Sequence, residues 1–282
     1  MPELPEVETV AQQLKKVILQ KKVKAVEIRK AKSWVGDPKA VNGKTIQNIS
    51  RRAKIIRIGF GHNLNLLIHL KMSGQLIYVD GKKRFGGGHP TADWIQDLPS
   101  SHTRVIFTFI DNTKLFFNDQ RIFGWIKVMN DQEVAKEFDK LAPDIIDPAI
   151  TPTYLAQKFA KRSILVKQMI MDNTILSGVG NIYACDALNL AKISPLRPAK
   201  QLSPAEIQTL LKSMRHVINL GIKKGGATAH GKYVHVTGLA GKYQDFMLVY
   251  GKKDEPCPNC GQPIQKIRLA GRGTFYCPHC QT

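Results

Sequence analysis

Four of the five cysteines lie close to the C-terminus, in two Cys-x2-Cys pairs separated by 16 residues: Cys257, Cys260, Cys277 and Cys280. Thiolates at this spacing are typical of a tetrahedral structural zinc site. Two disulfides are the alternative, which a reducing cytoplasm disfavours. We therefore expect one structural Zn²⁺.

The residues between the two pairs must position them. They are long enough for a hairpin but too few to bury a core without metal. This hairpin carries Lys266, Arg268 and Arg272 and no acidic residue, which suits a phosphate backbone, although ordinary solubilising charges would give the same pattern. Cys185 stands alone in a helical segment, so we expect it to be a small buried apolar residue.

The overall charge favours a polyanionic partner. Lys and Arg number 42 against 22 Asp and Glu, a net charge of +20, so nucleic acid is favoured over a merely solvated basic surface. The 282 residues are enough for one large or two modest domains. No apolar run is long enough to cross a membrane and the N-terminus does not resemble a signal peptide, so we expect a cytoplasmic protein with no membrane partner.

The N-terminal half predicts an α+β unit. Val7, Val10, Leu14 and Val17 recur on one helical face. Short β-branched or aromatic segments then predict an antiparallel β-sandwich, with strands at 23–28, 55–60, 64–70, 75–79, 105–110 and 114–117. Residues 80–101 contain three consecutive glycines, two prolines and many polar residues, which indicates a long surface loop.

The C-terminal half predicts helices. Pro143, Pro148 and Pro152 punctuate a linker before it. The clearest helix begins with Ser203 as N-cap and Glu206 completing a capping box, and it stops at Gly225.

The N-terminus is open to two interpretations. Pro2 and Pro5 suit the start of a helix, where Glu3, Glu6 and Glu8 are favoured by the positive end of the helix dipole. On these residues alone, a simple helix start explains the segment.

A second interpretation comes from four segments taken together: residues 1–9 (MPELPEVET), 51–54 (RRAK), 176–183 (LSGVGNIY) and 271–281 (GRGTFYCPHCQ). Through them the whole chain resembles the bacterial formamidopyrimidine-DNA glycosylases, which are 8-oxoguanine glycosylases and abasic-site lyases. The resemblance implies a catalytic β-sandwich domain with an N-terminal helix (1–142), a linker (143–153), a helical domain with a helix-two-turn-helix and a lesion-capping loop (154–250), and a zinc finger (251–282).

The resemblance also implies catalytic roles. Removal of Met1 would leave Pro2 with a secondary amine that attacks the sugar C1′, and β,δ-elimination then cuts the strand. Glu3 would handle protons at the ribose and Glu6 would support the site. Lys54 would act as an acid or phosphate contact, and Arg272 would assist the second elimination. Without the family resemblance, Lys54 would be interpreted as an exposed cation on a strand.

DNA contacts are implied in the same way. A damaged nucleotide must leave the stack, and Met72, Arg121 and Phe123 match the side chains that fill the gap. Without the family, Met72 and Phe123 would be core or turn residues. Further phosphate contacts match Arg162, Lys167, Asn181 and His102, whereas the sequence alone makes Asn181 a simple N-cap.

The match weakens at several positions. Ile122 stands where a basic residue is usual, Gln120 where proline or a small turn residue is common, and His230 and Gly231 depart from the pattern of the capping loop. Lesion choice is therefore less secure than the chemistry.

Three alternatives follow. An endonuclease VIII-type glycosylase would favour oxidised pyrimidines, although Leu4 and residues 271–274 look more like the purine branch. A catalytically silent zinc-dependent DNA-binding protein would bind without a covalent intermediate, and a zinc-ribbon scaffold would not explain the charge. The main expectation is a bacterial, nucleoid-associated monomer that acts on damaged double-stranded DNA.

Overall fold

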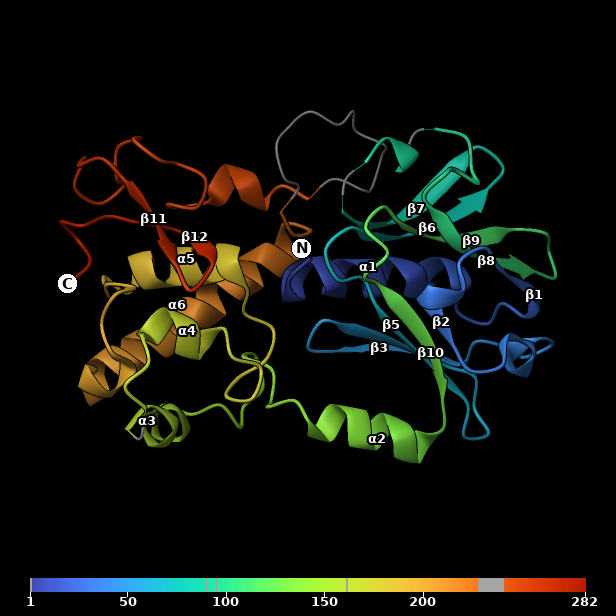
Figure 1. Ribbon diagram of the computed structural model, residues 1–282, viewed down its shortest axis with the longest axis horizontal. Helices are drawn as coiled ribbons and strands as arrows, with labels where there is room; N and C mark the ends of the chain where they lie inside the picture. Colours follow the sequence, from blue (N-terminus) through green and yellow to red (C-terminus); the bar gives the residue numbers. More distant parts are fainter. Residues whose placement is uncertain (1, 90, 95, 161, 228–240) are drawn as a thin grey trace. The chain divides into compact units, whose positions relative to one another are not determined.

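A computed structural model describes residues 2–282 except 90, 95, 161 and 228–240, which include the expected capping-loop departures at His230 and Gly231 (Figure 1). The chain divides into two compact units, Met1–Asp139 with Lys224–Gln244, and Lys140–Lys223 with Asp245–Thr282. No helix within the described residues is both long and apolar enough to cross a membrane.

The first unit contains two five-stranded sheets. One has the order β1 (Val23–Ile28), β8 (Thr103–Phe109), β9 (Lys114–Asp119), β6 (Gly74–Asp80) and β7 (Lys83–Gly88); the other has the order β2 (Trp34–Val35), β10 (Trp125–Met129), β5 (Asn65–His69), β4 (Ile55–Gly59) and β3 (Asn48–Arg52). Every pairing is antiparallel except that of β2 with β10. One hydrophobic core joins side chains of both sheets, so the expected β-sandwich is confirmed.

Helix α1 (Leu4–Ile18) packs against both sheets, because it contacts β7 at the edge of one and β3 at the edge of the other (Figure 1). Val7, Val10 and Leu14 are buried as their spacing predicts. Val17 is only partly buried, and Ile18 takes its place in the core. Pro2 and Glu3 directly precede this helix, and its first turn carries Glu6.

The interpretation of residues 80–101 as one long loop is wrong at its start, because β7 pairs along its length with β6. Glycine lowers strand propensity but is needed here. A Cβ on Gly87 would lie 2.8 Å from Cγ2 of Val10 on α1, and one on Gly86 would lie 1.9 Å from the carbonyl oxygen of Leu76. The glycines thus allow helix and sheet to approach closely.

The second unit is mainly helical, with α3 (Pro152–Ala160), α4 (Val166–Ile170), α5 (Asn181–Leu190), α6 (Pro204–Lys223) and the hairpin β11 (Gln265–Leu269) and β12 (Arg272–Tyr276). Helix α2 (Asp131–Asp139) belongs to the first unit. The short 3-10 helices are η1 (Ala31–Ser33), η2 (Pro38–Val41), η3 (Ala92–Trp94), η4 (Ala199–Gln201) and η5 (Tyr243–Phe246). The capping box at Ser203 is confirmed, since its N–H donates to Glu206 Oε2 (2.8 Å) and its Oγ accepts from Glu206 N–H (3.3 Å).

Residues after α6 differ from the expected grouping, which placed them in a helical domain, 154–250. Lys224–Gln244 instead belongs to the first unit. The physical reason is local: the Ala227 N–H donates to Glu6 Oε1 on α1 at 2.7 Å.

Candidate functional site

The N-terminal site begins at Pro2 and Glu3, which are both buried directly before α1. Glu3 and Glu6 form a reciprocal capping box, in which Glu6 Oε2 accepts the Glu3 N–H at 2.8 Å. The other oxygen of Glu6 accepts the Ala227 N–H. One carboxylate therefore fixes the backbone beside Pro2 and the segment that follows α6.

Gly226 is required by this arrangement. Its φ is +80°, and a Cβ there would lie 2.8 Å from Cγ of Glu6. The backbone carbonyl of Gly226 also accepts the Tyr243 N–H, at 3.0 Å. The described ends of this segment are thus held together next to the carboxylate of Glu6.

Lys54 is buried, at 8% exposure, in the turn between β3 and β4. The turn is locked onto α1, because Arg51 Nε donates to Glu8 (2.7 Å) and its Nη1 donates to the carbonyl of Ala53 (2.8 Å). The alternative interpretation of Lys54 as an exposed strand cation is therefore wrong.

Met72, Arg121 and Phe123 gather on two neighbouring turns, and we call them the wedge cluster. Arg121 Nη1 lies 3.1 Å from Met72 Sδ, and its guanidinium lies 4.9 Å from the centre of the Phe123 ring. Met72 and Phe123 are 40% and 48% exposed, so they are not core residues. Beside them lies a hollow of about 500 Å³ whose lining includes Lys32 and Lys71.

Asp119 holds the wedge cluster in place and was missed by sequence reasoning. Its buried carboxylate accepts the N–H groups of Gly124 (2.6 Å) and Arg121 (3.2 Å) and the hydroxyl of Ser73. Ile122, between them, has a φ of +55°. An acidic residue at the start of a six-residue turn motif was the available signal, since such side chains commonly bind turn amides.

His69 supports the same region from β5. Its Nδ1 accepts the Lys71 N–H at 2.9 Å, and its ring centre lies 5.6 Å from that of Trp125. Burial, with smaller contributions from the charges of Lys71 and Lys54, lowers the pKa of His69 to about 3. The ring is therefore neutral at physiological pH and can accept this hydrogen bond.

In the second unit, Lys167, Asn181 and the zinc hairpin come together. Lys167 is 2% exposed, and its ammonium donates to Asn181 Oδ1 (2.7 Å) and Thr274 Oγ1 (2.6 Å). Asn181 Nδ2 donates to the carbonyl of Gly273 at 2.9 Å. Arg272 and Lys167 both line a pocket of about 250 Å³.

The N-cap interpretation of Asn181 is wrong, because Gly180 is the N-cap of α5 and Asn181 is its first helical residue. Arg162 is not part of this group: its side chain is 44% exposed and pairs with Asp172 at 3.4 Å. His102, in the first unit, pairs with Asp93. Sequence reasoning missed the roles of Asp93 and Thr274. Asp93 lies in no motif, and Thr274 lies in the motif 271–281 but contacts Lys167, which is far away in sequence.

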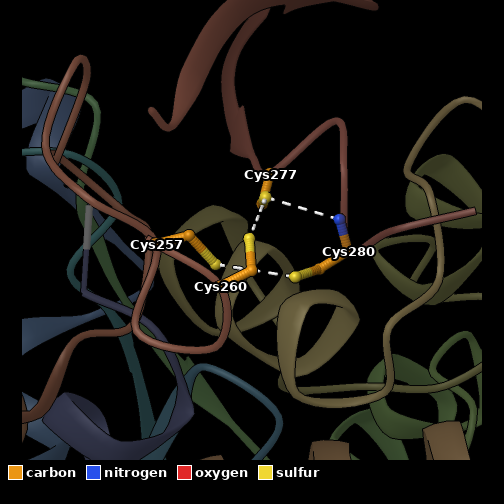
Figure 2. A group of neighbouring side chains, drawn as sticks. All are labelled: Cys257, Cys260, Cys277 and Cys280. Atoms are coloured by element: carbon orange, nitrogen blue, oxygen red, sulfur yellow. Dashed lines mark hydrogen bonds between the residues drawn. The ribbon is translucent and has the colours of Figure 1, made fainter. Parts of the chain in front are cut away.

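The four C-terminal cysteines converge on one point (Figure 2). Their sulfur atoms all lie within 4.8 Å of one another, with 3.9 Å between Cys257 and Cys280 and 3.6 Å between Cys260 and Cys277. Tetrahedral Zn–S bonds of about 2.3 Å give S–S separations of about 3.8 Å, so this set fits one Zn²⁺. No disulfide links these cysteines, and all five are free thiols.

Backbone amides prepare the cluster for a cation. Although burial raises the pKa of Cys257, hydrogen bonds from the amides of Asn259 and Cys260 lower it to about 7, which favours the thiolate. Hydrogen bonding with Cys260 raises the pKa of Cys280 to about 12, as expected where one sulfur of a close set holds the negative charge. Cys185 is 1% exposed and burial raises its pKa to about 11, which confirms it as a buried apolar residue.

Comparison with protein-family models gives three matches. They are the formamidopyrimidine-DNA glycosylase N-terminal domain (residues 1–126), the formamidopyrimidine-DNA glycosylase H2TH domain (141–232) and the zinc finger found in FPG and IleRS (254–282). Formamidopyrimidine-DNA glycosylases of Listeria monocytogenes and Pelotomaculum thermopropionicum are 36% and 34% identical, and the alignments cover all of this chain and 100% and 99% of those relatives. The chain belongs to the formamidopyrimidine-DNA glycosylase family. The expected family, fold class and class of repair enzyme are therefore confirmed.

Solved structures agree. A Lactococcus lactis FPG variant in complex with Fapy-dG-containing DNA has a TM-score of 0.89, and the same organism's FPG with abasic-site DNA has a TM-score of 0.88. Both are 32% identical in sequence, and both alignments cover 100% of each chain. These neighbours are protein–DNA complexes, which is consistent with the strongly basic composition found here.

Proposed function

We propose that this chain excises oxidised purines, 8-oxoguanine and formamidopyrimidines, from double-stranded DNA and cuts the strand at the resulting abasic site. The observation that carries the proposal is the N-terminal site, where Pro2 and Glu3 are buried at the start of a helix whose first turn is fixed by Glu6. The full-length match to a family with a member solved in complex with Fapy-dG-containing DNA supports the proposal.

The chemistry uses the chain's own groups. After removal of Met1, the amine of Pro2 attacks the sugar C1′ as the base leaves with its bonding electrons. The C1′–O4′ bond then breaks as the ring oxygen takes a proton, which gives an iminium at C1′. The iminium acidifies the C2′ proton, whose loss expels the 3′ phosphate, and a second elimination expels the 5′ phosphate. Glu3 transfers protons at the ribose, Lys54 acts as an acid or phosphate contact, and Arg272 assists the second elimination.

DNA binding uses both units. The wedge cluster fills the gap left by the extruded nucleotide, at a stacking cost of a few kcal/mol. Phosphates bind to His102, Arg162, Lys167 and Asn181. Zn²⁺, held by the four cysteines of Figure 2, has a structural role and orders the hairpin that carries Arg272. The protein acts as a monomer in the bacterial cytoplasm, at the nucleoid.

The range of lesions that the site accepts leaves a second candidate function. One neighbour is Lactococcus lactis FPG in complex with DNA containing an oxidised pyrimidine, with a TM-score of 0.88. Excision of oxidised pyrimidines, the endonuclease VIII-type activity, is therefore the alternative substrate class for the same site.

Borohydride trapping tests the proposal. The protein is incubated with duplexes containing 8-oxoguanine opposite cytosine, an oxidised pyrimidine or an abasic site, and the reduced adduct is mapped by mass spectrometry. We expect an adduct at Pro2 that forms faster with 8-oxoguanine than with the pyrimidine. Tight zinc-dependent binding with no adduct on any duplex would instead support the silent DNA-binding alternative, and the reverse lesion order would support the pyrimidine enzyme.

A further inference from the structure

His102 lies at the same end of its sheet as the wedge cluster. It directly precedes β8, and its carbonyl accepts the N–H of Asp119, the last residue of the antiparallel neighbour β9, at 2.9 Å. Asp119 in turn binds the amides of Arg121 and Gly124 through its carboxylate. The backbone of His102 is therefore connected through one residue, Asp119, to the turn that carries Arg121 and Phe123 of the wedge cluster.

Asp93 lies beside this imidazole and is almost fully buried, at 3% exposure. Its Oδ2 is 2.9 Å from His102 Nδ1 and accepts the hydroxyl of Thr91 at 2.8 Å. Burial acts to raise the pKa of Asp93, but hydrogen bonds from Ser100, His102 and Thr91 outweigh it and lower the pKa. The carboxylate is thus ionised and committed to these partners.

The backbone around Asp93 is fixed as well. Arg84 Nη1 on β7 donates to the Asp93 carbonyl at 3.1 Å, and Gln75 Nε2 on β6 donates to Thr91 Oγ1 at 2.8 Å. The His102 N–H donates to Ser100 Oγ at 3.1 Å. Two strands therefore hold the backbone of a segment that the sequence alone predicted to be a long surface loop, and this places Asp93 next to His102.

We propose that Asp93 is a positioning residue for DNA binding, which holds the His102 ring so that only Nε2 is presented to a phosphate of the DNA backbone. The inference rests on the proposed function. With Nδ1–H bonded to Asp93, the protonated ring has one N–H left, at Nε2, and this N–H donates to a phosphate oxygen. Among the described residues, three further charged groups belong to the same hydrogen-bond network: Arg84 donates to the Asp93 carbonyl, Arg104 donates to the Asp119 carbonyl, and the Asp119 N–H donates to the His102 carbonyl.

The sign of the effect separates positioning from simple electrostatics. Removing an acidic charge from a protein that binds a polyanion should strengthen binding. The positioning role predicts the opposite for Asp93→Asn. Asp97→Asn is the matched control, because Asp97 is an exposed acid in the same segment.

The experiment measures the affinity of the full-length zinc-loaded protein for a duplex with a tetrahydrofuran abasic analogue, by fluorescence anisotropy at several salt concentrations. We expect Asp93→Asn to weaken binding about 10- to 150-fold, the usual value of a charged hydrogen bond, while Asp97→Asn leaves binding unchanged or tighter. In a His102→Gln background, Asp93→Asn should change binding less than twofold. Both His102→Gln and Asp93→Asn should reduce the salt slope by about 0.9, the value for one phosphate contact.

Equal losses in both backgrounds, or binding by Asp93→Asn as tight as that of the unmodified protein, would overturn the inference while leaving trapping at Pro2 intact. Absence of trapping in the unmodified protein would instead overturn the proposed function. If Asp93→Asn does not fold, long-range ¹H–¹⁵N spectra of the unmodified protein decide the matter, with His102→Gln used for assignment. A proton on Nδ1 of His102 supports the inference, and an unprotonated Nδ1 overturns it.

Discussion

Glu6 offers the sharpest test of how the fold positions Pro2, the proposed nucleophile. Its two oxygens accept the N–H groups of Glu3 and Ala227 at 2.8 and 2.7 Å. In Glu6→Gln one oxygen becomes an NH2 group, which cannot accept, so one of these amides loses its partner. An unsatisfied amide costs about 1–3 kcal/mol. If that cost appears in the geometry at Pro2, the rate of reaction falls about 5- to 150-fold.

The assay is the single-turnover rate of borohydride-trapped adduct formation at Pro2, with saturating enzyme on a duplex containing 8-oxoguanine. Glu27→Gln is the control, because it makes the same chemical change on a side chain that is 65% exposed. A Glu6→Gln rate within twofold of the unmodified protein, at an unchanged thermal midpoint, would refute the claim that this carboxylate positions the N-terminus.

Three further outcomes are expected. Gly87→Ala should destabilise the protein by about 1–3 kcal/mol through overpacking against Val10, and it should lower the thermal midpoint by several degrees. Adding Val10→Ala should restore part of this loss. An unchanged midpoint in Gly87→Ala alone would contradict the close packing. Cys277→Ser should abolish zinc binding and weaken DNA binding at least about tenfold, whereas Cys185→Ser should keep the metal. Inductively coupled plasma mass spectrometry measures the zinc content, and fluorescence anisotropy measures DNA binding. Because the pKa of His69 is lowered to about 3, stability should be lost as pH falls from about 6.5 towards 3, by up to about 5 kcal/mol, and His69→Asn should show a shallower loss in urea titrations across that range.

Elements whose own segments carry a local signal could be predicted from the sequence. β4 and β5 were predicted from short β-branched segments, and the buried face of α1 was predicted from the spacing of Val7, Val10 and Leu14. β7 could not be, because its glycines are explained by the close approach of α1 and of the β6 backbone rather than by strand propensity. A rule based on local sequence treats such glycines as a loop signal.

The residues of the candidate site likewise divide into those that a local sequence pattern predicts and those that it does not. The zinc ligands follow from spacing, because the two pairs flank one short hairpin. Glu6 with Ala227, and Lys167 with Thr274, are separated by more than a hundred residues in sequence, so no local pattern indicates that they meet. The family resemblance named one member of each pair, and the fold supplied the other.

Ile122 shows why a departure from the family pattern need not weaken the site. It has a φ of +55°, an unfavourable conformation for a β-branched residue, which generally costs about 1–3 kcal/mol. Such a conformation persists only where neighbouring contacts determine it, and the Asp119 carboxylate binds the amides on both sides, at Arg121 and Gly124. The turn is thus shaped by Asp119 rather than by the residue at position 122, and Ile122 adds apolar surface to the hollow that it lines together with Met72 and Phe123. A basic residue there would give one more phosphate contact, whereas isoleucine extends the apolar surface beside the side chains proposed to enter the base stack.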